Sequence, residues 1–176
     1  DRVGTFIAQL QAHFEQDYTI ERELSGGGMS QVVLAHDRRH DRRVVIKLLP
    51  ASVTAAISAE RFEREILLSA ALQHPNIVPV LNSGKVNALP YFVMPFIEGE
   101  SLRAKLAREG ELPVAEAARI LREVTDALSY AHERGIVHRD IKPDNVMISS
   151  GHALVTDFGV AKAVTESTGG QSLTSL

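Results

Sequence analysis

The sequence of 176 residues contains no cysteine and no tryptophan, and aromatic residues make up only 5% of it. The absence of cysteine excludes disulfides, zinc–thiolate sites and cysteine nucleophiles, and it fits a reducing compartment. The sequence also lacks a run of about 18 apolar residues and the basic start of a signal peptide. We therefore expect this stretch of chain to be cytoplasmic and to hold no membrane segment, and an anchor beyond residue 176 is compatible with the sequence.

An excess of positive charge is missing as well. Nineteen Lys and Arg residues stand against 22 Asp and Glu residues, which gives a formal net charge of -3 and a pI near 6.2. Without a basic field over the molecule, neither nucleic acid nor an anionic membrane is an expected partner, whereas local phosphate sites remain compatible. Hydrophobic residues at 44% and charged residues at 23% are typical of a globular protein, and the length suits one domain or two small lobes.

The hydrophobic pattern predicts a helix followed by a sheet. Phe6, Leu10 and Phe14 recur every four residues, which predicts an amphipathic helix from about residue 2 to residue 15. Short β-branched runs then predict a mostly antiparallel sheet, with one helix inserted at about residues 55–72. The five predicted strands cover residues 18–24, 31–36, 43–49, 77–83 and 90–94.

The pattern becomes helical after residue 101. Apolar residues at helical spacing from Val114 to Ala131 predict the most secure helix, with Pro113 suited to its first turn and Gly135 to a left-handed position after its end. Two short runs, NVMIS and ALVTD, flank the turn SSGH and predict a β-hairpin. We expect the boundary between two lobes near residues 97–101.

Three features in the first half of the chain carry little weight when taken singly. The segment LSGGGMSQV, from Leu24 to Val32, lets backbone N–H groups approach a phosphate, but taken alone it is better explained as a plain hairpin turn. Lys47 ends the run VVIK and either binds a phosphate or carboxylate or is a solvated residue of a strand edge. Glu65 on the inserted helix either faces such a lysine or belongs to a solvated helix face.

The string HRDIKPDN, from His138 to Asn145, is of a different kind. It places an aspartate, a lysine two residues later and an asparagine five residues later in one compact polar loop, an order that solvation alone does not require. The triplet DFG, from Asp157 to Gly159, follows a strand twelve residues after Asn145. A lone DFG is uninformative, but after HRDIKPDN a chance turn explains it poorly.

From about Tyr18 to Lys162 the sequence resembles the protein kinases, specifically the eukaryotic-like (Hanks-type) Ser/Thr kinases of bacteria. The resemblance implies an α+β, protein-kinase-like fold with a complete N-terminal lobe, made of an antiparallel sheet and the αC helix. After the amphipathic helix predicted from the apolar spacing, which we place at residues 1–16, the resemblance implies the N-terminal lobe and hinge at 17–97. It implies a partial, helical C-terminal lobe at 98–176. This last segment would hold the catalytic loop, the DFG triplet and the start of the activation loop.

The resemblance gives the residues of the loop and the triplet roles in phosphoryl transfer, a reaction in which the protein positions the reactants and neutralises charge. Asp140 is expected to accept or orient the proton of the substrate hydroxyl, and Lys142 to neutralise the transferred group. Asn145 and Asp157 are expected to hold Mg²⁺. A lysine two residues after the catalytic aspartate is similar to the Ser/Thr-kinase loop, so the expected acceptor is an aliphatic hydroxyl.

The resemblance also implies an ATP site in the N-terminal lobe. Lys47 is expected to hold the α- and β-phosphates and to pair with Glu65. Alignment on YFVMPFIEG makes Met94 the gatekeeper, and the proline after it loses nothing that adenine needs, because that position contributes only a carbonyl. The other residues expected at the nucleotide belong to the glycine-rich turn, the adenine sandwich and the hinge: Leu24, Ser25, Gly26, Gly27, Gly28, Met29, Val32, Val45, Pro95, Ile97 and Met147.

Two features depart from the kinase pattern. Only the middle glycine, Gly27, of the G-x-G-x-x-G frame is kept, and Val45 replaces the usual alanine of V-A-I-K, so we expect a lower nucleotide affinity. After Gly159 only 176 - 159 = 17 residues remain and no A-P-E motif follows, so we expect a fragment of a longer chain or a natural truncation. Apolar surface of the helix from Val114 would then favour self-association or completion by another polypeptide.

The segment after the DFG triplet contains several hydroxyl side chains. Arg139, just before the catalytic aspartate, resembles the arginine that pairs with a phosphorylated activation loop in many kinases. For any one hydroxyl, an unmodified loop residue is the simpler interpretation, yet we expect at least one to be phosphorylated. The available acceptors are Thr165, Ser167, Thr168, Ser172, Thr174 and Ser175.

The leading hypothesis is an enzyme, a protein serine/threonine kinase that uses ATP and Mg²⁺ to phosphorylate protein substrates and itself. The alternative is a truncated, kinase-like regulatory or scaffold module that binds nucleotide or a partner without transferring phosphate. A third interpretation, a small-molecule kinase of the aminoglycoside type, shares an Asp and an Asn at similar spacing but fits HRD, Lys142 and DFG poorly.

Overall fold

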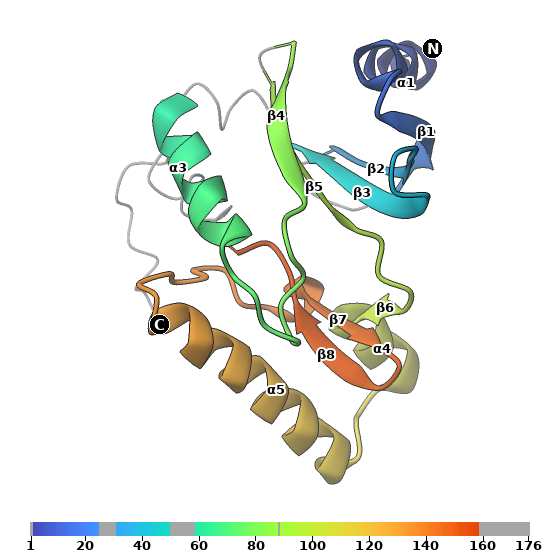
Figure 1. Cartoon of the computed structure of the whole chain (residues 1–176). Helices are drawn as coiled ribbons and strands as arrows, with labels where there is room; N and C mark the ends of the chain where they lie inside the picture. Colours follow the sequence, from blue (N-terminus) through green and yellow to red (C-terminus); the bar gives the residue numbers. More distant parts are fainter. Residues whose placement is uncertain (1, 25–30, 50–58, 88, 159–176) are drawn as a thin grey trace, which may run out of the picture. The chain divides into compact units, whose positions relative to one another are not determined.

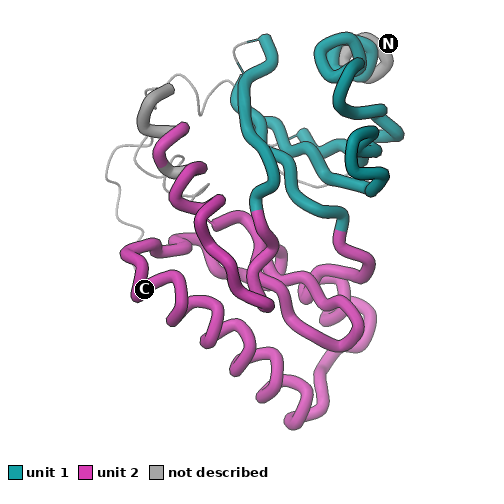
Figure 2. Tube along the Cα trace, viewed as in Figure 1, with its two compact units in different colours: residues 1–55, 80–96 teal, residues 56–79, 97–176 magenta. Residues whose placement is uncertain are grey.

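The structure is a computed structural model, and it describes residues 2–24, 31–49, 59–87 and 89–158. By their internal contacts the residues group into two compact units (Figure 2). Unit 1 comprises residues 1–55 and 80–96, and unit 2 comprises residues 56–79 and 97–176. The division into segments 1–16, 17–97 and 98–176 stays a prediction.

Unit 1 holds a helix and a five-stranded antiparallel sheet (Figure 1). The strands pair in the order β1-β2-β3-β5-β4, so the predicted antiparallel sheet is confirmed. The elements are α1 (Arg2–Phe14), β1 (Tyr18–Glu23), β2 (Gln31–Asp37), β3 (Arg42–Leu48), β4 (Asn82–Val86) and β5 (Leu89–Pro95).

One face of this sheet is buried under α1. Leu10 and Phe14 of the helix belong to one hydrophobic cluster with fully buried strand residues such as Val33, Val44 and Ile46. The alternation of side chains along a strand explains this pattern, because residues two apart lie on the same face. Gln11 adds a polar contact, since its side chain donates to the Tyr18 carbonyl at 3.2 Å and accepts from the Ile20 N–H at 2.7 Å. The helix therefore also covers backbone groups of the edge strand β1.

The strand predicted at residues 77–83 is wrong, since β4 begins only at Asn82. The apolar residues Ile77 and Val78 are buried, as the pattern indicated, but in the core of unit 2. Their backbone pairs with Val155 there, because the Val78 N–H donates to the Val155 carbonyl at 2.9 Å. Pro79 has no N–H with which to continue a strand ladder, so the run ends after this short pairing.

Unit 2 combines helices with a three-stranded sheet in the order β6-β7-β8. The hairpin predicted from NVMIS and ALVTD is confirmed, because β7 and β8 pair antiparallel across a two-residue turn. The elements are α3 (Ala59–Ala70), β6 (Glu100–Ser101), α4 (Leu102–Glu109), α5 (Val114–His132), a 3-10 turn η1 (Pro143–Asn145), β7 (Val146–Ser149) and β8 (His152–Val155).

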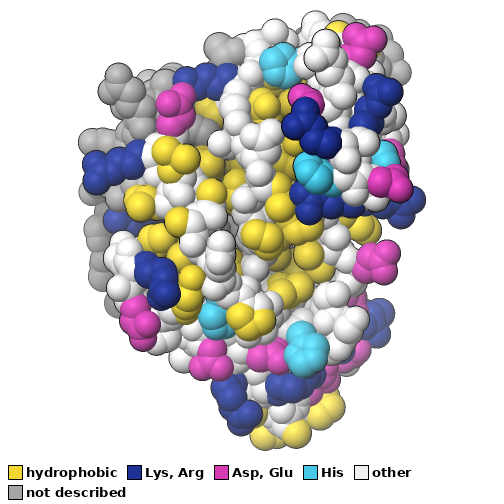
Figure 3. Space-filling view, viewed as in Figure 1, with side chains coloured by type: hydrophobic (Ala, Val, Ile, Leu, Met, Phe, Trp, Pro, Cys, Tyr) yellow, Lys and Arg dark blue, Asp and Glu magenta, His cyan; other side chains and the backbone are white. Residues whose placement is uncertain are grey.

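The helix α5 matches the helix predicted from Val114 to Ala131. Pro113 lies at its N-cap position, and Gly135 after its end adopts a φ of 74°, in the left-handed region that favours glycine. Val114 is 86% exposed and Leu121 is 66% exposed. Figure 3 shows hydrophobic atoms at the surface where this helix begins. Among the described residues, no helix is long and apolar enough to cross a membrane.

The helix α4 was not anticipated from the sequence. Ser101 caps its start, with the side-chain oxygen accepting from the Ala104 N–H at 3.1 Å, and Gly110 closes its end. None of its residues is fully buried, and its half-buried apolar residues are only Leu102 and Leu106, so the apolar pattern over this segment is short. The helix is stabilised by the Ser101 cap and by the packing of Leu102 against a buried cluster of unit 2.

Candidate functional site

The loop between α5 and β7 is organised around a buried histidine. His138 is 1% exposed, and its Nε2 lies 2.7 Å from the Thr156 carbonyl oxygen, which can only accept a hydrogen bond. Nε2 therefore carries the proton, and Nδ1 accepts from the Asp140 N–H at 3.2 Å. Burial lowers the pKa of His138 and outweighs the hydrogen bond to Thr156, so the neutral ring is favoured. This histidine joins the HRD turn to the residue before the DFG triplet.

The neutrality of His138 predicts a pH-dependent stability. Because burial lowers its pKa in the folded state, the unfolded chain binds the proton more readily, and stability is lost as the pH falls below the ordinary pKa of histidine. We expect the free energy of unfolding to fall by up to about 1 kcal/mol from this group between pH 7.5 and pH 5.5. Urea unfolding at both pH values measures it.

The replacement His138→Phe should reduce the stability at both pH values but remove this part of the pH dependence. The exposed His132 at the end of α5 provides the control, because His132→Gln should leave the dependence as in the wild type. An unchanged pH dependence in His138→Phe would show that other groups cause it.

The Asp140 carboxylate is held between a lysine and an amide. Its Oδ2 lies 2.9 Å from Lys142 Nζ and accepts from Asn145 Nδ2 at 3.2 Å, and Nδ2 also donates to the Asp140 carbonyl at 2.8 Å. The hydrogen bond to Asp140 raises the pKa of Lys142, which keeps the ammonium charged. The Asp140 side chain is 45% exposed, so the carboxylate is fixed and still accessible to a second reactant.

Asn145 and Asp157 leave the same end of the β7–β8 ladder. Val146 pairs with Val155, and the Thr156 N–H donates to the Asn145 carbonyl at 3.0 Å, so the two side chains come from adjacent strands. Asp157 adopts a φ of 65°, in the left-handed region. Such backbone conformations are uncommon and cluster at functional sites.

These two residues fit a Mg²⁺ ion. Carboxylate and amide oxygens are the hard ligands that Mg²⁺ prefers, and Mg²⁺ is usually held by one or two carboxylates together with phosphates rather than by a cage of side chains. Because Asn145 directs its Nδ2 towards Asp140, its carbonyl oxygen Oδ1 is the end left for a cation. No cluster of three or more His, Asp or Glu residues suited to a metal was found in the part of the chain that the structure describes.

Phe158 of the DFG triplet is buried in the core of unit 2. Its ring packs edge-on against the His138 ring with 4.7 Å between centroids. Its backbone carbonyl accepts from Ser69 Oγ of α3 at 2.9 Å. Phe158 is therefore held by α3 as well as by the loop that carries Asp140.

The residues predicted at the nucleotide in unit 1 share one face of the sheet. Val32 lies opposite Lys47, and Val45 lies opposite Met94, so the cross-strand register brings all four to the face away from α1. Each of the four is half-buried. Leu24 follows β1 and its N–H donates to the Val32 carbonyl at 2.8 Å.

The remaining predicted residues are divided between described and undescribed parts of the chain. Pro95 ends β5 in unit 1, whereas Ile97 and Met147 belong to unit 2, with Met147 on β7 opposite Ser101. Glu65 lies on α3 as expected, but its side chain is outside the described set. Outside the described residues lie two groups: Ser25, Gly26, Gly27, Gly28 and Met29 of the glycine-rich turn, and the expected phosphorylation sites Thr165, Ser167, Thr168, Ser172, Thr174 and Ser175.

Three residues that organise the site had no role predicted from the sequence. They are His138, Ser69 and Glu123, the last of which accepts a hydrogen bond from the Ala153 N–H on the strand leading to Asp157. The histidine had one local signal, because it follows the apolar pair Ile136 and Val137 directly. Ser69 and Glu123 had none, since their partners are 89 and 30 residues away.

Comparison with known proteins shows which family this chain resembles. The model of the protein kinase domain matches residues 18–175, so α1 precedes the matched segment. The chain is 41% identical to the serine/threonine-protein kinase PknB of Mycobacterium leprae over 162 residues, which cover 89% of this chain and 26% of that protein. It is 39% identical to the probable serine/threonine-protein kinase pknA2 of Bifidobacterium longum, over 88% of this chain and 21% of that protein. The chain thus spans about a quarter of the length of these relatives.

Solved structures resemble the fold. The kinase domain of PknI from Mycobacterium tuberculosis matches with a TM-score of 0.74 and 33% identity, over 82% of this chain and 60% of that one. Rad53 residues 1–466 in complex with AMP-PNP matches with a TM-score of 0.74 and 27% identity, over 84% of this chain and 39% of that one. The kinase-like fold expected from the sequence is confirmed.

Proposed function

This chain belongs to the protein kinase family, and on that premise we propose that it transfers the γ-phosphoryl group of ATP to serine and threonine hydroxyls of proteins. The observation that carries the proposal is the Asp140 carboxylate, held by Lys142 and Asn145 in a loop fixed by the buried His138. The relatives named as serine/threonine-protein kinases support the choice of acceptor.

In the proposed reaction the acceptor hydroxyl oxygen attacks the γ-phosphorus. A bond forms between these two atoms, the bond from the γ-phosphorus to the bridging oxygen breaks, and ADP leaves. Asp140 orients the hydroxyl and accepts its proton, because its Oδ2 is fixed and accessible. Lys142, kept charged by the same carboxylate, neutralises negative charge on the transferred group.

The metal site of the proposal consists of Asn145 and Asp157. Mg²⁺ bound there supplies charge neutralisation at the phosphate oxygens and a template for their orientation. The chain itself sets the separation of the two ligands, since they extend from adjacent strands with one hydrogen-bonded register. Asn145 is oriented by its two contacts to Asp140, which couples the metal ligand to the base.

The nucleotide site of the proposal uses the face of the unit 1 sheet that lies away from α1. Val32 and Val45 would pack on the adenine ring, and Lys47 on the same face would bind the α- and β-phosphates and pair with Glu65. Met94 with Pro95 and Ile97 would form the edge of the adenine pocket, and Met147 its floor. The glycine-rich turn from Leu24 to Met29 would cover the phosphates.

We further propose a cytoplasmic location, in which ATP and protein substrates meet this part of the chain. We also propose that a hydroxyl after residue 159 is phosphorylated and that Arg139 pairs with the phosphate.

The exposed apolar side chains of α5 would permit self-association.

The direct test is incubation of the purified chain with Mg·ATP and a serine- and threonine-containing protein, followed by intact-mass spectrometry. We expect phosphate increments on serine or threonine that disappear when the metal is chelated. A chain that binds the nucleotide by fluorescence titration but adds no phosphate to itself or to the acceptor would contradict the proposal and favour a nucleotide-binding scaffold.

A further inference from the structure

The strand β8 leads directly into the proposed metal ligand Asp157, so its position sets the position of that side chain. One edge of β8 pairs with β7. On the other edge, Val155 pairs with the chain segment of residues 76–78, and the Ala153 carbonyl accepts from Asn76 Nδ2 at 2.9 Å. These contacts are all made by backbone or amide groups.

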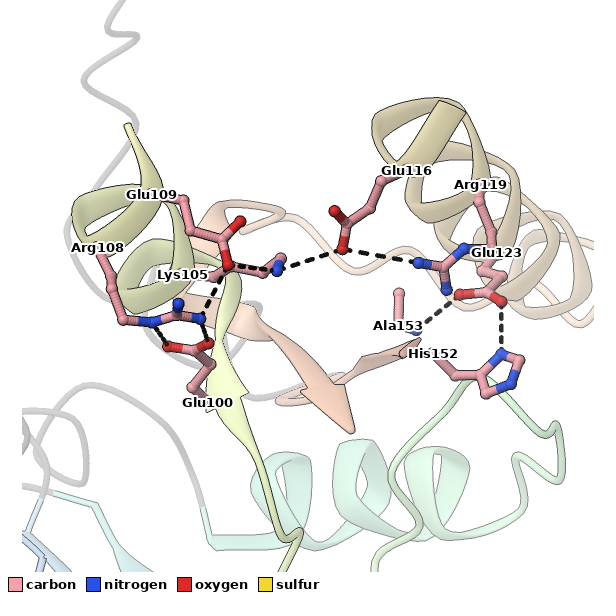
Figure 4. Close-up of polar contacts among 9 residues, drawn as sticks. All are labelled: Glu100, Lys105, Arg108, Glu109, Glu116, Arg119, Glu123, His152 and Ala153. Carbon is pink, nitrogen blue, oxygen red and sulfur yellow. Dashed lines mark hydrogen bonds and ion pairs between the residues drawn. The ribbon is translucent and has the colours of Figure 1, made fainter. Parts of the chain in front are cut away.

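The Ala153 N–H on this outer edge has a different partner. It donates to Glu123 Oε2 of α5 at 2.7 Å, while Glu123 Oε1 lies 2.8 Å from His152 Nδ1 (Figure 4). One carboxylate therefore holds the first two residues of β8 from a helix 30 residues earlier in the chain. The Glu123 side chain is only 15% exposed, which shields this contact from water.

Charge favours the contact. Burial opposes ionisation of Glu123, but the hydrogen bonds from the Ala153 N–H and from His152 outweigh it, so the pKa of this carboxyl lies below its ordinary value. Arg119, one turn earlier on α5, adds a favourable charge. An ionised carboxylate accepting from a backbone N–H makes a stronger hydrogen bond than a neutral group does.

The helix that carries Glu123 is itself fixed by charged contacts. Lys105 of α4 lies 2.9 Å from Glu109 and 3.3 Å from Glu116 of α5, and Arg119 continues the series 3.7 Å from Glu116 (Figure 4). The Lys105 side chain is only 12% exposed. Because α5 is held in this way, its position sets the position of β8 through the largely buried side chain of Glu123.

We propose that Glu123 is a positioning residue for the metal site, acting through the Ala153 N–H to hold β8 and thereby the spacing of Asn145 and Asp157. Ala153 pairs with Ile148 of β7, and the same register ends where Asn145 and Asp157 leave the two strands. A displaced β8 changes the separation of the two ligands without removing either. Groups that orient metal ligands in this indirect way typically alter metal affinity by about 10-fold to 100-fold when they are removed. The inference rests on the proposed function, because it assumes that these two residues bind Mg²⁺.

The test compares four variants of the chain. Glu123→Ala removes the acceptor, whereas Glu123→Gln keeps an amide oxygen that can accept from the Ala153 N–H. His152→Ala removes the contact of the imidazole with Glu123 and leaves the backbone contact. Asp126→Asn, on an exposed position of the same helix, is the matched control.

The first readout is binding of Mn²⁺, used in place of Mg²⁺, in the presence of ADP, followed by the electron paramagnetic resonance signal of free Mn²⁺. We expect Glu123→Ala to weaken binding about tenfold and Glu123→Gln by less than about threefold, with the other two variants unchanged. An unchanged affinity in Glu123→Ala overturns the proposal. An equal loss in His152→Ala also overturns it, because the contact of Glu123 with the His152 side chain, and not the one with the Ala153 N–H, would then support metal binding.

The second readout needs no metal and separates this inference from the proposed function. Hydrogen exchange at the Ala153 and Thr156 amides of the metal-free chain should accelerate in Glu123→Ala and stay slow in Glu123→Gln. If the wild type bound no Mn²⁺ with ADP, the proposed function would fail, whereas this exchange pattern would still report whether Glu123 holds β8. Equal exchange in wild type and Glu123→Ala would refute the positioning role even in an active kinase.

Discussion

Replacing Asp140 by asparagine is expected to lower the rate of phosphoryl transfer by about a thousandfold and to leave nucleotide binding nearly unchanged. The amide keeps the shape of the side chain, and the Asn145 contact to the backbone carbonyl of residue 140 is independent of the substitution. The loss therefore concerns the proton acceptor and the charge beside Lys142. Initial rates with saturating Mg·ATP, together with the dissociation constant for ADP, measure both effects.

The same loop offers the control for this substitution. Asp144 lies four residues after Asp140, and it pairs with Arg103 of α4, at 3.3 Å between Nε and Oδ2. This ion pair is exposed at both ends, so it contributes little to stability. We expect Asp144→Asn to change the rate less than about fivefold. Equal losses in the two variants would mean that the negative charge of the loop, and not a proton acceptor at residue 140, supports the reaction.

The sheet of unit 1 was predictable because its strands bury one face, which gives a sequence pattern in which buried apolar residues alternate with less buried ones. In β3, Val44, Ile46 and Leu48 are buried, while Val45 and Lys47 between them lie on the other face. The helix α1 was likewise visible because Leu10 and Phe14 face the core. Where an element buries no residue fully, as in α4, the apolar pattern is short and the helix was missed. The strand predicted at 77–83 failed for another reason, because its apolar residues Ile77 and Val78 are buried within unit 2 and not in the sheet of unit 1.

In the candidate site, too, some residues were predictable from the sequence and others were not. The order of Asp140, Lys142 and Asn145 is local, and the fold brings the three together within one loop. The contacts that fix this loop join distant positions: His138 reaches Thr156, and Ser69 reaches Phe158. These pairs form only in the fully packed chain, and the local sequence around either residue does not indicate its partner. The residues proposed to act in the chemistry were therefore predictable, and those that hold them were not.

Replacing Asp157 by asparagine is expected to reduce transfer about a hundredfold at a fixed, moderate Mg²⁺ concentration, a loss of about 3 kcal/mol of transition-state stabilisation. The substitution isolates the charge, because residue 157 has a φ of 65°, where asparagine is tolerated as well as aspartate and alanine is strained. The rate should recover in part as the Mg²⁺ concentration rises, since an amide oxygen still binds the ion weakly. Rates measured across a Mg²⁺ titration distinguish this from a loss at the proton acceptor, which no amount of metal restores.

A second aspartate with a positive φ tests whether the backbone conformation alone explains the loss. Asp41, in the turn between β2 and β3, has a φ of 48° and a 95% exposed side chain whose Oδ1 lies 3.0 Å from His36 Nε2. Asp41→Asn should therefore keep the wild-type rate and Mg²⁺ dependence. If Asp157→Asn also kept the wild-type Mg²⁺ dependence, Asp157 would not be a metal ligand. The left-handed backbone at residue 157 would then serve to turn the chain so that Phe158 reaches the His138 ring, a structural role that Asp157→Gly would preserve.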